Sequence, residues 1–224
     1  MLTAIALSVV IVLLAAWELW ICEGTHLGRR FVVWMYDVAA GRYEGIKRFD
    51  PDWERRFLGE PLAAVLGGLP DARVLDVGAG TGRTARSLLA AQGGPPPWTV
   101  VNLEPSQRML GIGKRLVGPG VSWVRGWAVP LPFSSGSFDL VVSLEMLEFT
   151  PDPLQTLAEM RRVLRRGGIL LITNRIGWEA PLLFGKTVKR DLFARLLVQA
   201  GFQPSDVLPW QMDYDLAWAH KPWT

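Results

Sequence analysis

The stretch Val74-Leu75-Asp76-Val77-Gly78-Ala79-Gly80-Thr81-Gly82 decides how the chain folds. Its first four residues are mostly apolar, so we expect a buried strand over residues 74–77. Three glycines follow at alternate positions, and the pattern over residues 82–91 predicts a helix directly after them. A glycine-rich turn between a strand and a helix permits a tight backbone path and lets a ligand approach without a Cβ in the way. The stretch therefore predicts an α/β unit with a ligand-binding loop.

Beyond this stretch, strand-like and helical patterns continue to alternate toward the end of the chain. The clearest helical pattern begins with Asp152 as N-cap and Pro153 at the first helical position. Another helix is expected over residues 191–200. This alternation is typical of an α/β fold with a mostly parallel sheet. The expected strands after the first are residues 98–103, 121–125, 138–144 and 169–173, with short strand-like pieces near Val207 and over 214–219.

A run of arginines raises the question of nucleic-acid binding. Arg161, Arg162, Arg165 and Arg166 come just before Gly167, where the helix after Asp152 is expected to end. Cations in a last helical turn complement the helix dipole and stay solvated, which is the simpler interpretation. The net charge is only +3, and no nucleic-acid-binding module is recognisable. Nucleic acid is therefore not expected as a partner.

The number of cysteines excludes two kinds of protein. Among 224 residues there is a single cysteine, Cys22, which excludes an intramolecular disulfide and a multi-cysteine metal cluster. We expect no bound metal. The sequence does not indicate an oligomeric state.

A carboxylate follows the second expected strand. Glu104 lies 22 residues beyond Gly82, at the place where an acidic side chain can accept hydrogen bonds from both hydroxyls of a ribose. The dinucleotide fingerprint Gly-x-Gly-x-x-Gly requires glycine where this chain has Arg83. The loop and Glu104 together indicate a nucleoside-containing ligand, and Arg83 counts against NAD.

At this point the sequence resembles the class I S-adenosylmethionine-dependent methyltransferases, in particular the small-molecule, lipid and quinone branch. The resemblance covers roughly residues 71–221 and implies an α/β, Rossmann-like, doubly wound sheet of seven strands with the last strand antiparallel. The implied cofactor is S-adenosyl-L-methionine. The matching elements, in order, are residues 75–82, Val101-Asn-Leu-Glu-Pro-Ser106 with Met109, Gly126-Trp-Ala-Val-Pro-Leu-Pro-Phe133, Ser137-Phe-Asp-Leu-Val-Val-Ser-Leu-Glu145, residues 157–172, and an ending at Gly201-Phe202 and 214–221.

The resemblance assigns site residues position by position. The wall around the methionine part of the cofactor would be formed by Asp76, Gly78, Ala79, Gly80 and Gly82. Glu104 would accept from the ribose hydroxyls, and Pro105, Ser106 and Met109 would lie near the adenine. Ser143, Leu144 and Glu145, at the end of the fourth strand, would border the cofactor and the acceptor.

Two positions depart from the family pattern. Trp127 stands where the family usually has an aspartate that accepts from the adenine amino group, so indole stacking with backbone groups at Ala128 is the expected substitute. Related sequences often read Leu-Glu-His where this chain reads Leu147-Glu148-Phe149. With that histidine absent, Glu145 is the candidate for positioning the acceptor or taking its proton.

The N-terminus is expected to be a membrane anchor. Residues 1–17 contain no charged side chain, and with residues 18–22 they make a helix of about 33 Å against a hydrocarbon core of about 30 Å. Trp17 and Trp20 suit an interfacial belt, with Glu18 placed to reach water. A signal peptide fits less well, because no basic residue precedes the run. An interfacial helix, or a helix buried in an oligomer, remains open.

Basic residues predict the orientation of the anchor. None precedes the apolar run, whereas Arg29, Arg30 and Arg42 follow it, so the body should be cytoplasmic and the protein single-pass. Residues 31–36 either lie along the bilayer surface or face the core. We expect three parts: a transmembrane or anchoring helix at 1–22, a juxtamembrane helical cap or lid at 23–70, and the S-adenosylmethionine-binding domain at 71–224.

The cap contains a segment similar to the entry helix of lipid and quinone methyltransferases. Tyr36, Tyr43 and Lys47 would form a lid there, although a scaffold helix without ligand contact explains the pattern nearly as well. Trp178, after the fifth strand, is the candidate for acceptor specificity. An anchor, an apolar lid and this apolar loop suggest a lipid-like or amphipathic acceptor at the membrane.

The sequence therefore predicts an S-adenosylmethionine-dependent methyltransferase acting on a small acceptor at the cytoplasmic membrane face. Two alternatives stay open. One is an NAD-dependent oxidoreductase, and the other is a non-catalytic membrane adaptor that keeps the fold.

Overall fold

The computed structural model describes residues 1–69, 71–92 and 97–223 of the chain. Its centre is a seven-stranded sheet in the order β3-β2-β1-β4-β5-β7-β6, in which every pairing is parallel except those of β7. The seven strands and the antiparallel last strand are as predicted. The strands are β1 (Arg73–Val77), β2 (Thr99–Leu103), β3 (Ser122–Val124), β4 (Phe138–Ser143), β5 (Leu164–Arg175), β6 (Gln203–Trp210) and β7 (Tyr214–His220).

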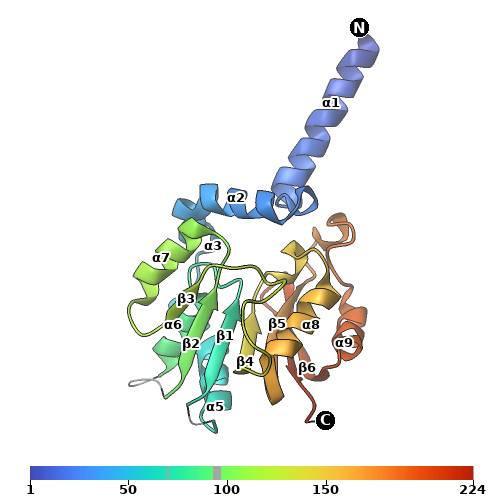
Figure 1. Cartoon of the computed structure of the whole chain (residues 1–224). Helices are drawn as coiled ribbons and strands as arrows, with labels where there is room; N and C mark the ends of the chain where they lie inside the picture. The colour runs from blue at the N-terminus through green and yellow to red at the C-terminus, as the bar shows by residue number, and fades with distance from the viewer. Residues whose placement is uncertain (70, 93–96, 224) are drawn as a thin grey trace.

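Helices cover both faces of the sheet (Figure 1). Side chains of β1 alternate between two apolar clusters, because successive residues of a strand point to opposite faces. Leu75 and Val77 lie in the cluster that includes residues of α8 and α9, and Val74 lies in the one that includes residues of α5 and α6. The helices that flank the sheet are α5 (Glu60–Leu66), α6 (Arg83–Ala91), α7 (Gln107–Val117), α8 (Pro153–Val163) and α9 (Arg190–Gln199).

The order of the strands reverses beside β1. The chain runs outward from β1 through β2 to β3 and then returns to place β4 on the other side of β1. In open α/β sheets, ligands bind in the crevice at the carboxyl ends of the strands at such a switch point. The glycine loop after β1 and Glu104 after β2 both lie at this edge.

Helix α8 ends earlier than its arginines suggested. The expected helix through Arg166 is wrong, because α8 ends at Val163 and β5 begins at Leu164, which is buried and pairs with Phe138. The Lys221 ammonium donates to the carbonyls of Arg161 and Leu164 at 2.8 and 2.6 Å, which satisfies acceptors at the helix end. Arg165 therefore lies on the strand, where it forms an ion pair with Asp139 at 2.6 Å.

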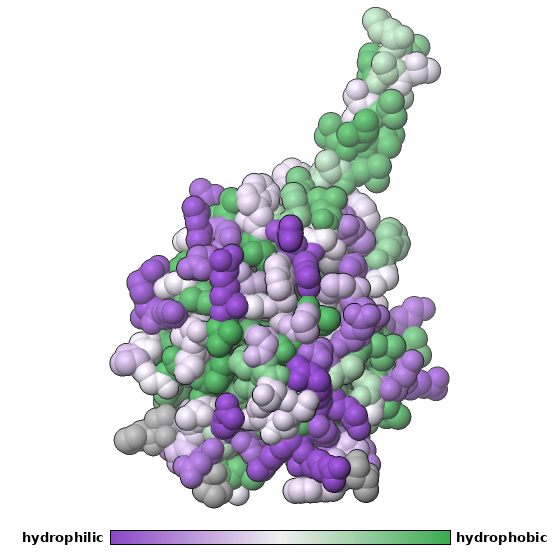
Figure 2. Space-filling model, in the orientation of Figure 1, coloured by the Kyte–Doolittle hydropathy of each residue, from purple (hydrophilic) through white to green (hydrophobic). Residues whose placement is uncertain are grey.

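The N-terminal helix projects from the body (Figure 1). Helix α1 (Leu2–Ala16) has no buried residue, and the π-helical turn Trp17–Ile21 continues it to 20 residues, long and apolar enough to cross a membrane. Figure 2 shows mostly hydrophobic residues along this helix, whereas the body has a mixed surface. Glycines and prolines at residues 93–97 predict a break between the helix expected over 82–91 and the strand expected over 98–103, and most of this break lies outside the described residues.

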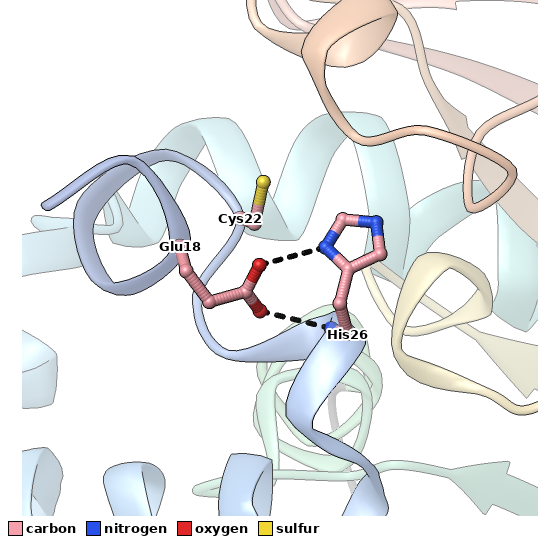
Figure 3. A group of neighbouring side chains, drawn as sticks. All are labelled: Glu18, Cys22 and His26. Atoms are coloured by element: carbon pink, nitrogen blue, oxygen red, sulfur yellow. Dashed lines mark hydrogen bonds and ion pairs between the residues drawn. The ribbon is translucent and has the colours of Figure 1, made fainter. Parts of the chain in front are cut away.

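The turn Trp17–Ile21 at the end of the N-terminal helix, which we call its foot, is held by hydrogen bonds, contrary to expectation. Glu18 was expected to reach water, but it is buried and accepts from the backbone N–H of His26 at 2.9 Å and contacts His26 Nδ1 at 2.8 Å (Figure 3). His26 Nε2 meets the carbonyl of Phe184 at 3.0 Å. Trp17 stacks on His26 and leaves only Trp20, 83% exposed, free for an interfacial role. The two tryptophans therefore do not form one belt.

Residues 23–69 fold as short helices, which begin at the carboxyl edge of the sheet with α2 and end with α5 packed against one face. Helix α2 (Arg29–Ala39) lies across the carboxyl ends of the strands, transverse to α1 (Figure 1). It is followed by α3 (Tyr43–Lys47), α4 (Pro51–Glu54) and the π-helical turn Arg55–Gly59, and short 3-10 turns cover Thr25–Leu27 and Ala40–Arg42. Leu58, Leu62 and Leu66 belong to the apolar cluster of the sheet, so this end of the segment is part of the core.

Candidate functional site

A pocket lies at the switch point of the sheet, beneath α2. Its empty volume, with the open mouth included, is about 840 Å³. The glycine loop and the ends of β2 and β4 form one side, and α2 with Tyr43 forms the other. The lining residues are Arg29, Val32, Val33, Tyr36, Tyr43, Gly78, Gly80, Leu103, Glu104, Pro105, Met109, Gly126, Trp127, Ala128, Val129, Leu144, Glu145, Met146, Phe149, Thr150 and Pro151.

A smaller cavity adjoins this pocket on the side of β1. It shares Tyr43, the glycine loop, Leu144 and Glu145 with the main pocket. The residues that line it alone are Asp76, Ala79, Thr81, Arg83 and Thr84. The two cavities together place Asp76 and Glu104 along one continuous wall that begins at the glycine loop.

The three glycines of the loop have different structural roles. All have positive φ, which other residues rarely adopt. A Cβ on Gly78 would lie 2.5 Å from the side chain of Met146, and one on Gly82 would lie 2.6 Å from that of Val117. A Cβ on Gly80 would meet nothing closer than 3.6 Å. Gly80 is therefore the glycine that leaves the backbone open to a ligand, whereas Gly78 and Gly82 permit close packing.

Glu104 is buried at the end of β2 and holds the glycine loop. Its two carboxylate oxygens accept from the backbone N–H groups of Gly80 and Ser106, each at 2.8 Å. Burial raises the pKa of Glu104 to about 7, although those two N–H groups favour the ionised form. Each oxygen keeps a lone pair, so the carboxylate can accept two further hydrogen bonds from the pocket. Burial likewise raises the pKa of Asp76 to about 7.

Glu145 is the centre of a buried ion-pair network. Its carboxylate contacts Lys47 Nζ at 2.5 Å and Arg83 Nη1 at 2.6 Å. Arg83 also donates to both oxygens of Glu54, at 2.7 and 2.8 Å. Burial opposes the charge of Glu145, but the two cations outweigh it and hold the pKa of this carboxyl below its usual value. An ionised carboxylate with both oxygens paired is better suited to fixing Lys47 and Arg83 than to accepting a proton.

The segment expected as a lid contacts the pocket from above. Tyr36 and Tyr43 both line it, and the Tyr36 ring packs edge-on against Phe149 at 5.7 Å. Lys47 lines neither cavity, and it contacts the pocket wall through its hydrogen bond to Glu145. At the far end of α2, Asp37 accepts from Ser106 Oγ at 2.5 Å, which fixes the helix to the start of α7.

Trp127 is already covered on one face. The Arg29 guanidinium lies 4.7 Å from the centre of the indole ring and donates to the carbonyl of Val129 at 2.8 Å. The N-terminal end of α2 is therefore closed over the loop that follows β3. A ligand ring that stacks on Trp127 must use the other face of the indole.

Comparison with known proteins identifies the family. A family model described as "Methyltransferase domain" matches residues 75–172. An uncharacterized methyltransferase of Synechocystis sp. is 36% identical over 166 residues, which are 66% of this chain and 74% of that protein. The chain belongs to this methyltransferase family.

Two further comparisons define how far the similarity extends. A demethylmenaquinone methyltransferase of Renibacterium salmoninarum is 35% identical over 140 residues, which are 62% of this chain and 56% of that protein, so the match spans little more than half of the relative. Among solved structures, the [4+2]-cyclase SpnF superposes with a TM-score of 0.69 at 20% identity, covering 87% of this chain and 96% of that one. This last likeness concerns the fold alone.

The structure brings most of the site residues predicted from the sequence to the two cavities. Those that line neither are Gly82, Ser106, Ser143, Lys47 and Trp178. Ser106 caps α7, and the Ser143 hydroxyl donates to the carbonyl of Val77 at 3.1 Å, so both support the wall from behind. Trp178 is 76% exposed and does not border the pocket. Which of these residues bind a ligand stays a prediction.

The sequence prediction included Tyr36 of α2 but missed the contribution of the residues before it and the role of Arg83. Arg29, Val32 and Val33 line the pocket, whereas the sequence prediction used Arg29 only for the orientation of the N-terminal helix in a membrane. The spacing of Val32, Val33 and Tyr36 on one helical face was the available signal. Arg83 entered only as an unsuitable residue for a dinucleotide loop, and nothing near it in the sequence indicates its two acidic partners.

Proposed function

We propose that this chain transfers a methyl group from S-adenosylmethionine to a small lipid-like or amphipathic acceptor at the cytoplasmic face of a membrane. The observation that carries the proposal is Glu104, buried at the end of β2 with free lone pairs and hydrogen-bonded to Gly80 of the loop. A carboxylate in this position suits the two hydroxyls of a ribose. Family membership supports the same cofactor.

The residues present fit that cofactor. Glu104 would hold the ribose, and the open side of Gly80 leaves room for the methionine part beside Asp76 and Ala79. The adenine would lie near Pro105 and Met109, against the free face of Trp127, with Ala128 offering backbone groups. When bound, the cofactor supplies an electrophilic methyl group on a sulfonium.

The remaining residues of the chain would position the acceptor and exclude water. Val32, Val33 and Phe149 give the pocket an apolar roof, which suits a reaction in which positive charge disappears from sulfur. Tyr36 and Tyr43 would complete the lid. We assign Glu145 a positioning role through Lys47 and Arg83 rather than that of a base.

The acceptor class is inferred from three features. A relative of this chain is named for demethylmenaquinone, a quinone. The pocket roof is apolar, and α1 with its following turn is long enough to span a bilayer. We infer that residues 1–22 anchor the chain once, that 23–70 form the cap and that 71–224 form the cofactor domain. Arginines after the anchor favour a cytoplasmic body.

The test is a calorimetric titration of the full chain in lipid nanodiscs with S-adenosylhomocysteine and, separately, with NAD. We expect micromolar binding of the first ligand, and at least about tenfold weaker binding by Glu104→Ala, because two charge-assisted hydrogen bonds are lost. The matched control is Glu60→Ala, which removes a half-exposed carboxylate on α5.

Each other outcome selects a different function. Binding of NAD instead of S-adenosylhomocysteine would establish the oxidoreductase alternative. Binding of S-adenosylhomocysteine without methyl transfer from the labelled cofactor to any component of a membrane extract would favour the non-catalytic adaptor. No binding by folded protein would refute the proposed cofactor.

The affinity for S-adenosylhomocysteine is expected to rise with pH. The ribose hydroxyls donate to the ionised form of Glu104, whose pKa in the free protein is about 7, so binding below that pH must release a proton. The affinity should therefore increase several-fold from pH 6 to pH 7.5 and level off above. Titrations of Glu104→Gln should lose most of this dependence, and an unchanged profile in that variant would assign it to another group.

A further inference from the structure

Helix α2 has two functional faces. Its inner face carries Val32, which is 6% exposed, and Val33 and Tyr36, all of which line the pocket. Its outer face carries Arg30, Trp34 and Val38, which are four residues apart and so form one stripe. Trp34 and Val38 are 56% and 62% exposed. We call Arg30, Trp34 and Val38 the outer stripe of α2.

Further apolar side chains are exposed near the foot of α1 and just before α2. Leu27, just before α2, is 55% exposed, Trp20 is 83% exposed, and Phe184 from the loop after β5 is 66% exposed. Phe184 lies at the foot because its carbonyl contacts His26 and its ring packs against Trp17 at 5.7 Å. In Figure 1, α2 runs transverse to α1 at this level.

The length of the anchor places this surface relative to a bilayer. Helix α1, with 15 residues, projects from the body. The turn that follows it does not, because Glu18 and Trp17 contact His26 and Phe184 of the body. Fifteen residues make a helix of about 22 Å, about 8 Å less than a hydrocarbon core. If α1 crosses the bilayer, Trp17–Ile21 must also enter it. The top of the body, where α2 lies, is then drawn into the headgroup region.

Charge complements this placement. Arg30 and Arg42 are exposed, and within the described part of the chain neither has a carboxylate oxygen within 4 Å. Tryptophan and arginine together are typical of helices that lie in a membrane interface, where basic side chains attract anionic lipids. A surface of this composition fits a bilayer better than water.

We propose that the outer stripe of α2 lies in the headgroup region of an anionic bilayer, so that one helix contacts lipid with one face and roofs the pocket with the other. The proposal rests on the anchoring role in the proposed function and deepens it. The acceptor would pass from the bilayer around α2 into the pocket without crossing bulk water. The methyl-transfer site would then work only on molecules held at the membrane surface.

The test measures the depth of α2 with a spin label. Cys22, the single cysteine, is replaced by serine, and the label is attached at Val38→Cys in the full chain in nanodiscs that contain phosphatidylglycerol. The matched control is Val198→Cys, where Val198 is 59% exposed and belongs to α9, a helix that lies away from α1 (Figure 1). Collisions with oxygen, which concentrates in the bilayer, are compared with collisions with a water-soluble nickel complex.

We expect the ratio of oxygen to nickel collisions to be several-fold higher at position 38 than at position 198. Arg30→Gln with Arg42→Gln, or nanodiscs without anionic lipid, should lower that ratio. Equal ratios at the two positions would overturn the proposal. Dipolar broadening between labels at position 38 in discs with two chains would instead show that a second copy covers the stripe. S-adenosylhomocysteine titration of the same variants reports separately on the proposed function.

Discussion

Replacing Arg83 by methionine is expected to lower the free energy of unfolding by about 3–5 kcal/mol, because the change leaves the buried Glu54 carboxylate without its cation and leaves Glu145 paired with Lys47 alone. Arg83 is 8% exposed and pairs with Glu54 and Glu145. Its guanidinium also lies 4.4 Å from the centre of the Phe49 ring, a contact that methionine replaces only in part. Urea unfolding of the full chain in detergent, followed by tryptophan fluorescence, measures the loss.

Arg86→Met is the matched control, since Arg86 lies on the same helix and pairs with the partly exposed Glu44. A half-exposed pair is worth about 0–1 kcal/mol, so this variant should change little. Adding Glu54→Gln to Arg83→Met should recover part of the loss by removing one unpaired charge. Equal effects of Arg83→Met and Arg86→Met would show that the buried network contributes no more than a surface pair.

The second large effect is expected at Gly59, where Gly59→Ala should destabilise the fold by about 2–3 kcal/mol. A Cβ at this position would lie 2.1 Å from the carbonyl oxygen of Ser87 on α6. Because that atom belongs to the backbone, the two helical segments must move apart to admit it. The shift in the midpoint of urea unfolding measures the cost.

The control is Gly45→Ala in α3, where an added Cβ meets nothing within 4 Å. Alanine is the better helix former, so this variant should be neutral or up to about 1 kcal/mol more stable. The opposite signs of the two substitutions distinguish close packing from backbone propensity. A stabilising Gly59→Ala would contradict the tight contact between this turn and α6.

Much of the fold could be predicted from short patterns in the sequence. The strand, the alternate glycines and the acidic residue after the next strand are each encoded within a few residues, and they indicated the sheet and its binding edge. The end of α8 was mistaken because four arginines resemble a helical terminus, whereas Leu164 is drawn into the sheet by its pairing with Phe138. A tertiary contact decided that boundary.

The candidate site was predictable where it is made of strand ends and unpredictable where it depends on distant pairs. Glu145 was recognised by its position after β4, but its partners Lys47 and Arg83 lie 98 and 62 residues away. Glu18 was expected in water because charge in an apolar run usually reaches it, and only the fold brings His26 and Phe184 to this foot. Trp178 was predicted to contribute to acceptor specificity because it follows β5, whose end lies at the binding edge of the sheet, yet its side chain is exposed.

The separation between Lys47 and Glu145 has a consequence for biosynthesis. A chain is made from its N-terminus, so α1 and α2 leave the ribosome before any strand of the sheet exists. The hydrogen-bond partner of Asp37 is Ser106, which is synthesised 69 residues later, and the partner of Lys47 is Glu145, which is synthesised 98 residues later. Until then the inner face of α2 has no pocket to cover. A nascent chain halted before β4 would therefore expose the inner face of α2 and its outer stripe at the same time, and apolar surface exposed in this way during synthesis is prone to aggregation.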